Sequence, residues 1–297
     1  MTTKTVRPEG VTMAAAHEHG DGHGHDGRIV LMHATAPTCW WSWGYEAVLN
    51  RMRMVYGDQI RYGVFYATVY EDLEEYKKHY EVDDAGMREW TKEAIELMGV
   101  PMHDTPQLSK FPKSMLPATI AVLAAMLQGH EKGERFFRAL LRRFVVEDRD
   151  VTKEAELLDA AKEAGVDGPR LLKEMADGEA RHAQMEAQGE GFPGVGVGFY
   201  NLAVTDGHGT TVMLDHAFDP AKVEAAIDFV SGGKLKKSRP KDLVGYVRKQ
   251  GPTPLVEVAR VFGLSGKDAE AELSAYVKKG ELATVTLAGA TFWKAGR

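Results

Sequence analysis

One segment near the N-terminus constrains the fold most, because two apolar runs flank a cysteine and an amphipathic stretch. The run from Arg28 to Ala34 predicts a buried strand. The residues that follow predict a helix that begins just after Cys39, continues to about Tyr56 and ends at Gly57. The aromatic and β-branched run from 59 to 68 predicts a second strand. This strand–helix–strand order indicates a parallel pair joined by a right-handed crossover.

The middle of the chain predicts a long helical region between about 71 and 187, which prolines and glycines divide into segments. Strand patterns return from 195 to 204 and from 210 to 216, with a turn between them at 206–209. A closing helix is expected over 220–230. Residues 28–230 therefore predict one α/β domain whose helical subdomain is inserted between strands.

The last part of the chain differs from the rest in charge. Residues 234–297 carry 13 Lys and Arg against 6 Asp and Glu, a net charge of +7, whereas the remainder carries 24 against 37. This change of sign predicts a linker over 231–239 and a second domain over 240–297. Helices are expected over 240–249, 253–262 and 267–279, followed by two strands within 281–294. Three helices and a β-hairpin are typical of a small winged-helix-like α+β domain.

The bulk composition is that of a globular protein outside the membrane. The 297 residues suggest two domains, and no apolar run is long enough to cross a bilayer. Residues 1–27 contain no secretory signal pattern, and we therefore expect a cytoplasmic protein. The chain contains one cysteine, which excludes an intramolecular disulfide.

That cysteine, Cys39, is expected where a strand ends and a helix begins. The amide groups and the dipole of a helix N-terminus stabilise a thiolate, so the sequence predicts a lowered pKa and a nucleophilic thiol. Trp40, Trp41 and Trp43 would supply flat apolar walls for a substrate. A different interpretation stays open, because a lone cysteine is often a small buried apolar residue and three tryptophans also suit a core.

The segment from Pro37 to Tyr45, Pro-Thr-Cys-Trp-Trp-Ser-Trp-Gly-Tyr, resembles the active-site stretch of DsbA-family oxidoreductases and protein-disulfide isomerase-like relatives. The resemblance extends over about residues 28–230 and includes helical segments at 136–151 and 157–167. It implies a thioredoxin-like fold with an inserted helical subdomain. It also implies that Cys39 is the catalytic nucleophile.

Two positions depart from the family pattern. Ser42 stands where the family has a second cysteine, so Cys39 would act as a monothiol through a mixed disulfide with a protein or a small thiol such as glutathione. Ser42 would then donate a hydrogen bond to the Cys39 thiolate. In the stretch Pro193, Gly194, Val195 and Gly196, the resemblance implies a substrate-binding loop, with Gly196 at the place of the family's cis-proline.

Metal binding is a weaker expectation. His17, His19, His23 and His25 lie in a Gly-rich N-terminal tail that is expected to be disordered, and such a tract can chelate metal ions weakly or be merely solvated. A thiolate metal site at Cys39 would need further donors, from His33, a small thiol or a second subunit. No cofactor is certain from these patterns.

The C-terminal domain has two possible roles. Its positive charge favours DNA, but the third predicted helix carries Asp268, Glu270 and Glu272, which would face phosphate unfavourably. A protein partner or a homodimer contact is the alternative.

Two functions therefore remain open. The first is a monothiol DsbA-like oxidoreductase, isomerase or thiol-dependent transferase that acts through Cys39 and Ser42. The second is a non-redox protein that senses or binds a thiol, a metal or another ligand through a degenerate thioredoxin domain and uses residues 240–297 for interaction.

Overall fold

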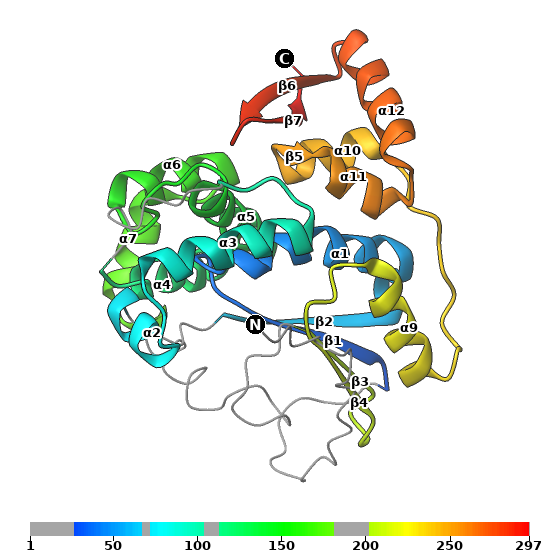
Figure 1. The fold of residues 1–297 in the computed structure, drawn as a ribbon, viewed down its shortest axis with the longest axis horizontal. Helices are drawn as coiled ribbons and strands as arrows, with labels where there is room; N and C mark the ends of the chain where they lie inside the picture. Colours follow the sequence, from blue (N-terminus) through cyan, green and yellow to red (C-terminus); the bar gives the residue numbers. More distant parts are fainter. Residues whose placement is uncertain (1–26, 67–71, 104–112, 181–201, 297) are drawn as a thin grey trace, which may run out of the picture.

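A four-stranded sheet forms the centre of the N-terminal domain in the computed structural model, which describes residues 27–66, 72–103, 113–180 and 202–296. The strand order is β2-β1-β3-β4 (Figure 1). Strands β1 (Ile29–Thr35) and β2 (Ile60–Tyr66) pair in parallel, and β3 (Leu202–Thr205) pairs antiparallel with both β1 and β4 (Thr211–Leu214). The predicted strand–helix–strand unit is thereby confirmed.

Helix α1 (Trp40–Tyr56) connects the two parallel strands. Cys39 is its N-cap residue with extended backbone, and Gly57 ends it with φ 53°, a conformation that a glycine adopts without a Cβ clash. The helix buries Val48, Met52 and Val55 against the sheet and the inserted helices. Its bounds agree with those expected from the sequence.

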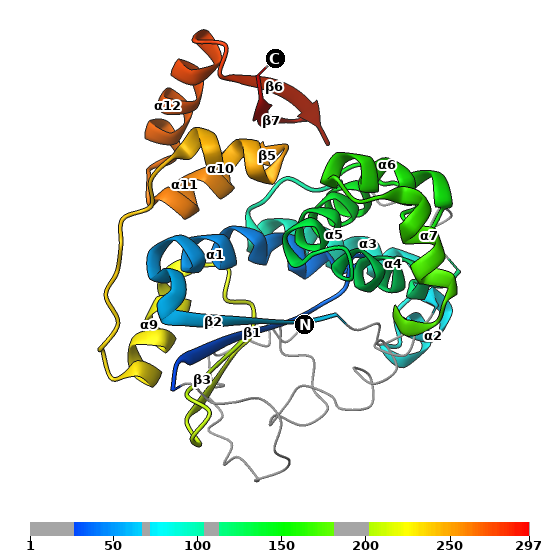
Figure 2. The same cartoon turned by 180° about the vertical axis from the view of Figure 1, so that it is seen from behind.

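Six described helices form the insertion, which gathers at one side of the sheet (Figures 1 and 2). They are α2 (Leu73–His79), α3 (Asp84–Met98), α4 (Leu116–Met126), α5 (His130–Val145), α6 (Glu154–Ala164) and α7 (Gly168–Ala176). Helix α4 is almost entirely apolar and lies between α5 and α7. The predicted helical subdomain is confirmed within the described residues.

The domain closes with a hairpin and helix α9 (Pro220–Ser231). The hairpin turn is held by Asp206, whose carboxylate accepts hydrogen bonds from the N–H groups of His208 and Thr210 at 2.8 and 3.0 Å. The strand expected over 195–204 is described only from Leu202.

The C-terminal module, residues 240–296, has the predicted order of elements. It contains α10 (Leu243–Gln250), β5 (Thr253–Pro254), α11 (Leu255–Phe262), α12 (Gly266–Lys278), β6 (Leu282–Leu287) and β7 (Ala290–Ala295). The sheet order is β5-β7-β6, and the module has an apolar cluster of its own that includes Val247, Val261 and Trp293. One detail differs: Thr253 and Pro254, expected in a helix, pair with β7 because proline at 254 suits an edge strand that leads into α11.

The connecting segment 231–239 is held against the N-terminal domain. Ser238 donates its N–H to the carbonyl of Val55 at 2.8 Å, and the Gln59 side chain bonds both backbone groups of Lys236. Lys237 lies 3.0 Å from Glu224 and from Asp228. Among the described helices, none is long and apolar enough to cross a membrane.

Candidate functional site

Cys39 lies at the junction of β1 and α1, as the sequence predicts. Its N–H donates to the carbonyl of Ala36 at 3.0 Å, and this turn directs the chain from the sheet into the helix. The thiol is free and the residue is partly exposed. Part of the Cys39 residue is therefore accessible at the surface.

Ser42 occupies the next turn of α1 and is buried, with 1% of its surface exposed. Its hydroxyl oxygen accepts a hydrogen bond from the hydroxyl of Thr35 at 2.6 Å. Thr35 is the last residue of β1, so this bond links the end of the strand to the start of the helix. The Ser42 hydroxyl proton can then point at the Cys39 sulfur.

The protonation state of Cys39 differs from the expectation. Burial of the sulfur raises the pKa of the Cys39 thiol, while hydrogen bonds from the Ser42 side chain and from the N–H groups of Ser42 and Trp41 lower it by less. The predicted lowering is therefore wrong. A helix N-terminus stabilises a thiolate only to the extent that its dipole exceeds the cost of removing the charge from water, and here the cost is larger.

The three tryptophans separate into two environments. Trp41 is partly exposed and stacks on Phe218 at a ring distance of 5.9 Å, with the edge of His216 at 4.6 Å. Trp40 is partly exposed and packs against a small cluster between α2 and α3. Trp40 and Trp41 therefore lie beside the cysteine as surface that a ligand could contact. His216 and Phe218 were not expected there, since they come from the loop after β4 and no local pattern marks them.

Trp43 is not a pocket wall. It is 2% exposed, and its indole N–H donates to the carbonyl of Pro101 at 3.0 Å. Its ring faces the guanidinium of Arg138 at 5.2 Å. The expectation that Trp43 binds substrate is wrong, because its position on α1 faces the inserted helices and the core requires a large apolar side chain there.

Some of the expected site residues cannot be placed. Pro193, Gly194, Val195 and Gly196 lie outside the described residues, as do His17, His19, His23 and His25. Within the described part of the chain, no group of three or more His, Cys, Asp or Glu side chains is arranged to hold a metal ion.

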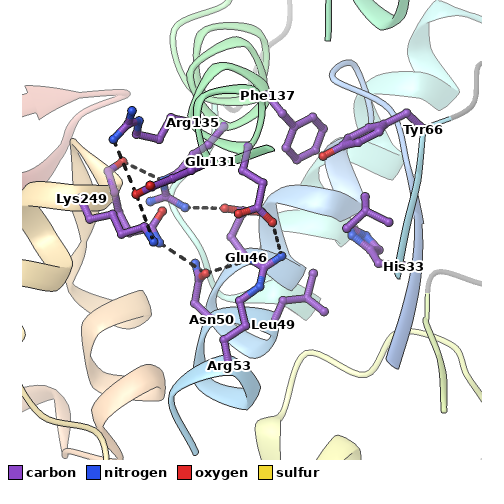
Figure 3. Close-up of a pocket in the computed structure, with 14 residues that line it drawn as sticks. His33, Glu46, Leu49, Asn50, Arg53, Tyr66, Glu131, Arg135, Phe137 and Lys249 are labelled. Atoms are coloured by element: carbon purple, nitrogen blue, oxygen red, sulfur yellow. Dashed lines mark hydrogen bonds and ion pairs between the residues drawn. The ribbon is translucent and has the colours of Figure 1, made fainter. Parts of the chain in front are cut away.

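His33 lies in a separate buried pocket of about 40 Å³ between β1, α1 and α5 (Figure 3). Burial, with a smaller effect of the Arg53 charge, lowers the pKa of His33 to about 3. Its Nε2 has no protein hydrogen-bond partner among the described atoms. The pocket has room for one or a few water molecules, which can satisfy such a group. The positive charge of Arg53, which lines the same pocket, makes the surroundings of His33 unfavourable for a metal ion.

Buried polar contacts join the two domains, and no pattern in the sequence predicts them. Arg138 of α5 donates to Glu46 of α1 at 2.7 Å and to Glu257 of α11 at 2.9 Å. It also donates to the carbonyl of Gln250 at the end of α10, at 2.9 Å. Burial lowers the pKa of Arg138, but the charges of Glu257 and Glu46 raise it further, and the net shift is upward. The Tyr246 hydroxyl completes the network with a 2.5 Å bond to Glu257.

A second arginine fixes the other end of α11. Arg51 of α1 donates to the carbonyls of Arg260 and Val261 at 3.3 and 3.1 Å, and its Nε lies 2.7 Å from Glu224. The last carbonyls of a helix carry partial negative charge, so a guanidinium is favourable there. The C-terminal module is thus attached along α1 by two arginines.

Comparison with known proteins gives matches at two levels. The thioredoxin family model matches residues 34–186, which is more than half of the chain. The solved structure of the cytosolic disulfide reductase DsbM from Pseudomonas aeruginosa is 18% identical, with a TM-score of 0.51, and the match covers 68% of this chain and 97% of that one. A second structure of DsbM, with GSH, gives a TM-score of 0.50. These structural matches show the fold.

The curated relatives cover more of the chain. The ClpXP adapter protein SpxH of Halalkalibacterium halodurans is 27% identical over 87% of this chain and 86% of its own length. SpxH of Bacillus subtilis is 22% identical over 92% of this chain and 91% of its own length. The similarity therefore extends beyond the thioredoxin-like domain. The fold, the position of Cys39 and the family match agree, and the chain belongs to the thioredoxin family, with a DsbA-like fold.

Proposed function

We propose that the chain is a protein-binding adapter that uses the DsbA-like fold as a scaffold rather than for disulfide turnover. The observation that carries this proposal is the environment of Cys39. The residue one turn further on is a buried serine that already bonds Thr35, and burial raises the pKa of the Cys39 thiol. A dithiol cycle needs a resolving thiol, and this chain has no second cysteine to supply one.

The comparison with SpxH supports the same function. The adapters named ClpXP adapter protein are similar to this chain over 85–91% of their length, and this similarity includes the C-terminal module. The buried contacts of Arg138 and Arg51 hold that module on α1. Two rigidly joined domains present one continuous surface to a partner, as an adapter requires.

A protein partner suits the module better than DNA. On one face of the β6–β7 hairpin, Phe292 is buried in the core cluster of the N-terminal domain and Val285 is partly buried against it. Helix α12 exposes the carboxylates of Asp268, Glu270 and Glu272. These charges oppose a phosphate backbone. A cytoplasmic site of action and the oligomeric state stay predictions.

The test is reconstituted protein degradation. Proteins that accumulate when the gene is deleted are purified and incubated with ClpX and ClpP of the source organism, with and without this chain. We expect faster degradation of at least one of them when the chain is present, and the same acceleration with the Cys39→Ser variant. No acceleration of any accumulated protein would refute the adapter function.

A monothiol function is the second candidate, because Cys39 keeps the N-cap position with exposed surface and a Ser42 hydrogen bond. In this function Cys39 forms a mixed disulfide with a protein or with glutathione, and a second thiol resolves it. Mass spectrometry of the native protein purified without reductant tests it. A thiol adduct on Cys39, together with loss of client degradation in Cys39→Ser, would favour this candidate over the adapter that needs no thiol.

A further inference from the structure

A cleft of about 950 Å³ lies between the ends of α5 and α6 and the C-terminal module. Residues of both domains line this cleft. Figures 1 and 2 show the β6–β7 hairpin and α6, the elements that contribute to its two sides. The size is at the upper end of the range for a ligand-binding pocket. The cleft exists only because the two domains are fixed together.

The lining of the cleft is strongly cationic. Its basic residues are Arg135, Arg142, Lys162, Arg248, Lys249 and Lys294, with Arg138 at the base, and its acids are Glu147 and Glu163. The whole chain carries a net charge of −6, so this local excess of positive charge runs against the composition. A cleft lined by one sign of charge concentrates ligands of the opposite sign.

Several of these cations are available to a ligand. Lys162, Arg248 and Lys294 are exposed and form no ion pair among the described residues. Within the part of the chain that the structure describes, the Arg248 guanidinium donates to the carbonyl of Glu281 at 3.5 Å. The Nε of Arg135 is buried without a hydrogen-bond partner in the described structure, and its Nη1 lies 3.7 Å from Glu131. By contrast, Arg142 is occupied by Glu147 and Glu163.

The hairpin side of the cleft is mostly apolar, with Thr284 of β6 and Lys294 of β7 as its polar side chains. Ala283, Val285 and Leu287 alternate along β6 and line the cleft with Ala164 and Pro252. An extended peptide places successive side chains on opposite sides. A peptide in which acidic and apolar residues alternate would therefore direct carboxylates to the cations of the helices and to Lys294, and apolar side chains to the apolar residues of β6.

Nucleic acid fits this lining less well. Proteins that bind single strands stack the bases on aromatic side chains, and the lining of this cleft contains no Phe, Tyr or Trp. Carboxylates and apolar side chains together match both walls.

We propose that this cleft binds an acidic, extended segment of a partner protein. The inference deepens the adapter function proposed above and rests on it, because it names the surface and the chemistry through which a client or protease component is held. Lys162, Arg248 and Lys294 attract the acidic side chains of the segment and make binding specific for them. The apolar residues of β6 contact its apolar side chains.

The test uses the full chain and a short fluorescein-labelled peptide of alternating Glu and Leu. Fluorescence polarisation is measured at low and high salt, beside a peptide of alternating Lys and Leu and a labelled oligothymidylate. We expect the acidic peptide to bind, and its affinity to fall with salt because the pairs are exposed. The triple variant Lys162→Glu, Arg248→Glu, Lys294→Glu should bind it about tenfold or more weakly.

Two control variants test whether a loss of peptide binding comes from the cleft residues or only from the change in the net charge of the protein. Lys222→Glu combined with Lys267→Glu changes exposed lysines that do not line the cleft and should leave binding unchanged. The charge-conserving triple Lys162→Arg, Arg248→Lys, Lys294→Arg should retain most of the affinity. Equal loss in the control variant, no binding of the acidic peptide, or tighter binding of oligothymidylate would each overturn the proposal.

The degradation assay distinguishes this inference from the adapter function itself. If the triple reversal variant still accelerates client degradation fully, the cleft proposal fails and the adapter function stands. If the wild-type chain binds the acidic peptide in the cleft but accelerates no degradation, the adapter function fails and the peptide site stands.

Discussion

Arg138 and Glu257 form an ion pair of 2.9 Å that is buried on both sides, with 5% and 2% of the side chains exposed. It joins helix α5 of the thioredoxin-like domain to helix α11 of the C-terminal module. Because Glu46 lies on the other side of the same guanidinium, Arg138 connects three helices that are distant in sequence. The relative position of the two domains, and with it the cationic cleft, depends on this residue.

Arg138→Leu should reduce the free energy of unfolding by about 3–5 kcal/mol, because it leaves two carboxylates buried without a counter-charge. Denaturant unfolding of the full chain measures this loss. The matched control is Arg170→Leu, whose side chain is 56% exposed in its pair with Glu174 and should cost at most about 1 kcal/mol. The triple variant Arg138→Leu, Glu46→Leu, Glu257→Leu should recover much of the stability, since removing all the charges removes the penalty. Equal effects of the two single arginine variants would contradict the role of Arg138.

Gly263 is required where α11 ends against Arg51. Its φ is 65°, and an added Cβ would lie 3.1 Å from Nη1 of Arg51. Gly263→Ala should therefore lower stability by about 1 kcal/mol or more. Gly266→Ala is the matched control, because Gly266 begins α12 with open space around a Cβ and no positive φ, and it should be neutral or slightly stabilising. Thermal unfolding compares the two, and equal midpoints would show that the α11 end tolerates a side chain.

The sequence predicts the local features of this fold well. The sequence predicts a helix that begins just after Cys39 and ends at Gly57. The cap residue, the helical spacing of the apolar side chains and the terminating glycine are all local signals, which lie in the helix or directly beside it. The parallel pairing of β1 and β2 followed from the same segment. The thioredoxin-like fold of the N-terminal domain is confirmed on these grounds.

The ion pairs between the domains, the pKa of Cys39 and the burial of Trp43 depend on contacts between residues that are distant in the sequence. Arg138 and Glu257 are 119 positions apart, and no local pattern connects them. The raised pKa of Cys39 follows from burial by packed elements, whereas the sequence shows only that the residue begins a helix. Trp43 is the same residue type as Trp40 and Trp41, but its side chain faces the core. Nearby residues of a helix point in different directions, so the residue type alone does not show which tryptophan is buried.

His33 should make the protein less stable in acid. Its folded pKa of about 3 lies below the ordinary value of 6.5, so between these values the unfolded chain binds a proton that the folded protein excludes. Stability contributed by neutral His33 is therefore fully present above pH 6.5 and falls as the pH is lowered towards 3, by up to about 1.4 kcal/mol per pH unit. Unfolding free energies of the wild type and His33→Asn, compared across this range, measure the contribution. A ring NMR signal of His33 that titrates near pH 6.5 would contradict burial of the neutral form.

Cys39 should react slowly with iodoacetamide at neutral pH. Only the thiolate is alkylated, and burial raises the pKa of this thiol above the ordinary value, so the rate should rise with pH to a midpoint higher than that of the unfolded chain. Ser42→Ala should move the midpoint further upward, because the Ser42 hydroxyl stabilises the thiolate. Since Cys39 is the only cysteine, mass spectrometry of the intact chain reports its modification directly. The same chain in guanidinium chloride gives the reference profile. Faster alkylation of the folded protein than of the unfolded chain at pH 7 would show an activated thiol and would favour the monothiol function.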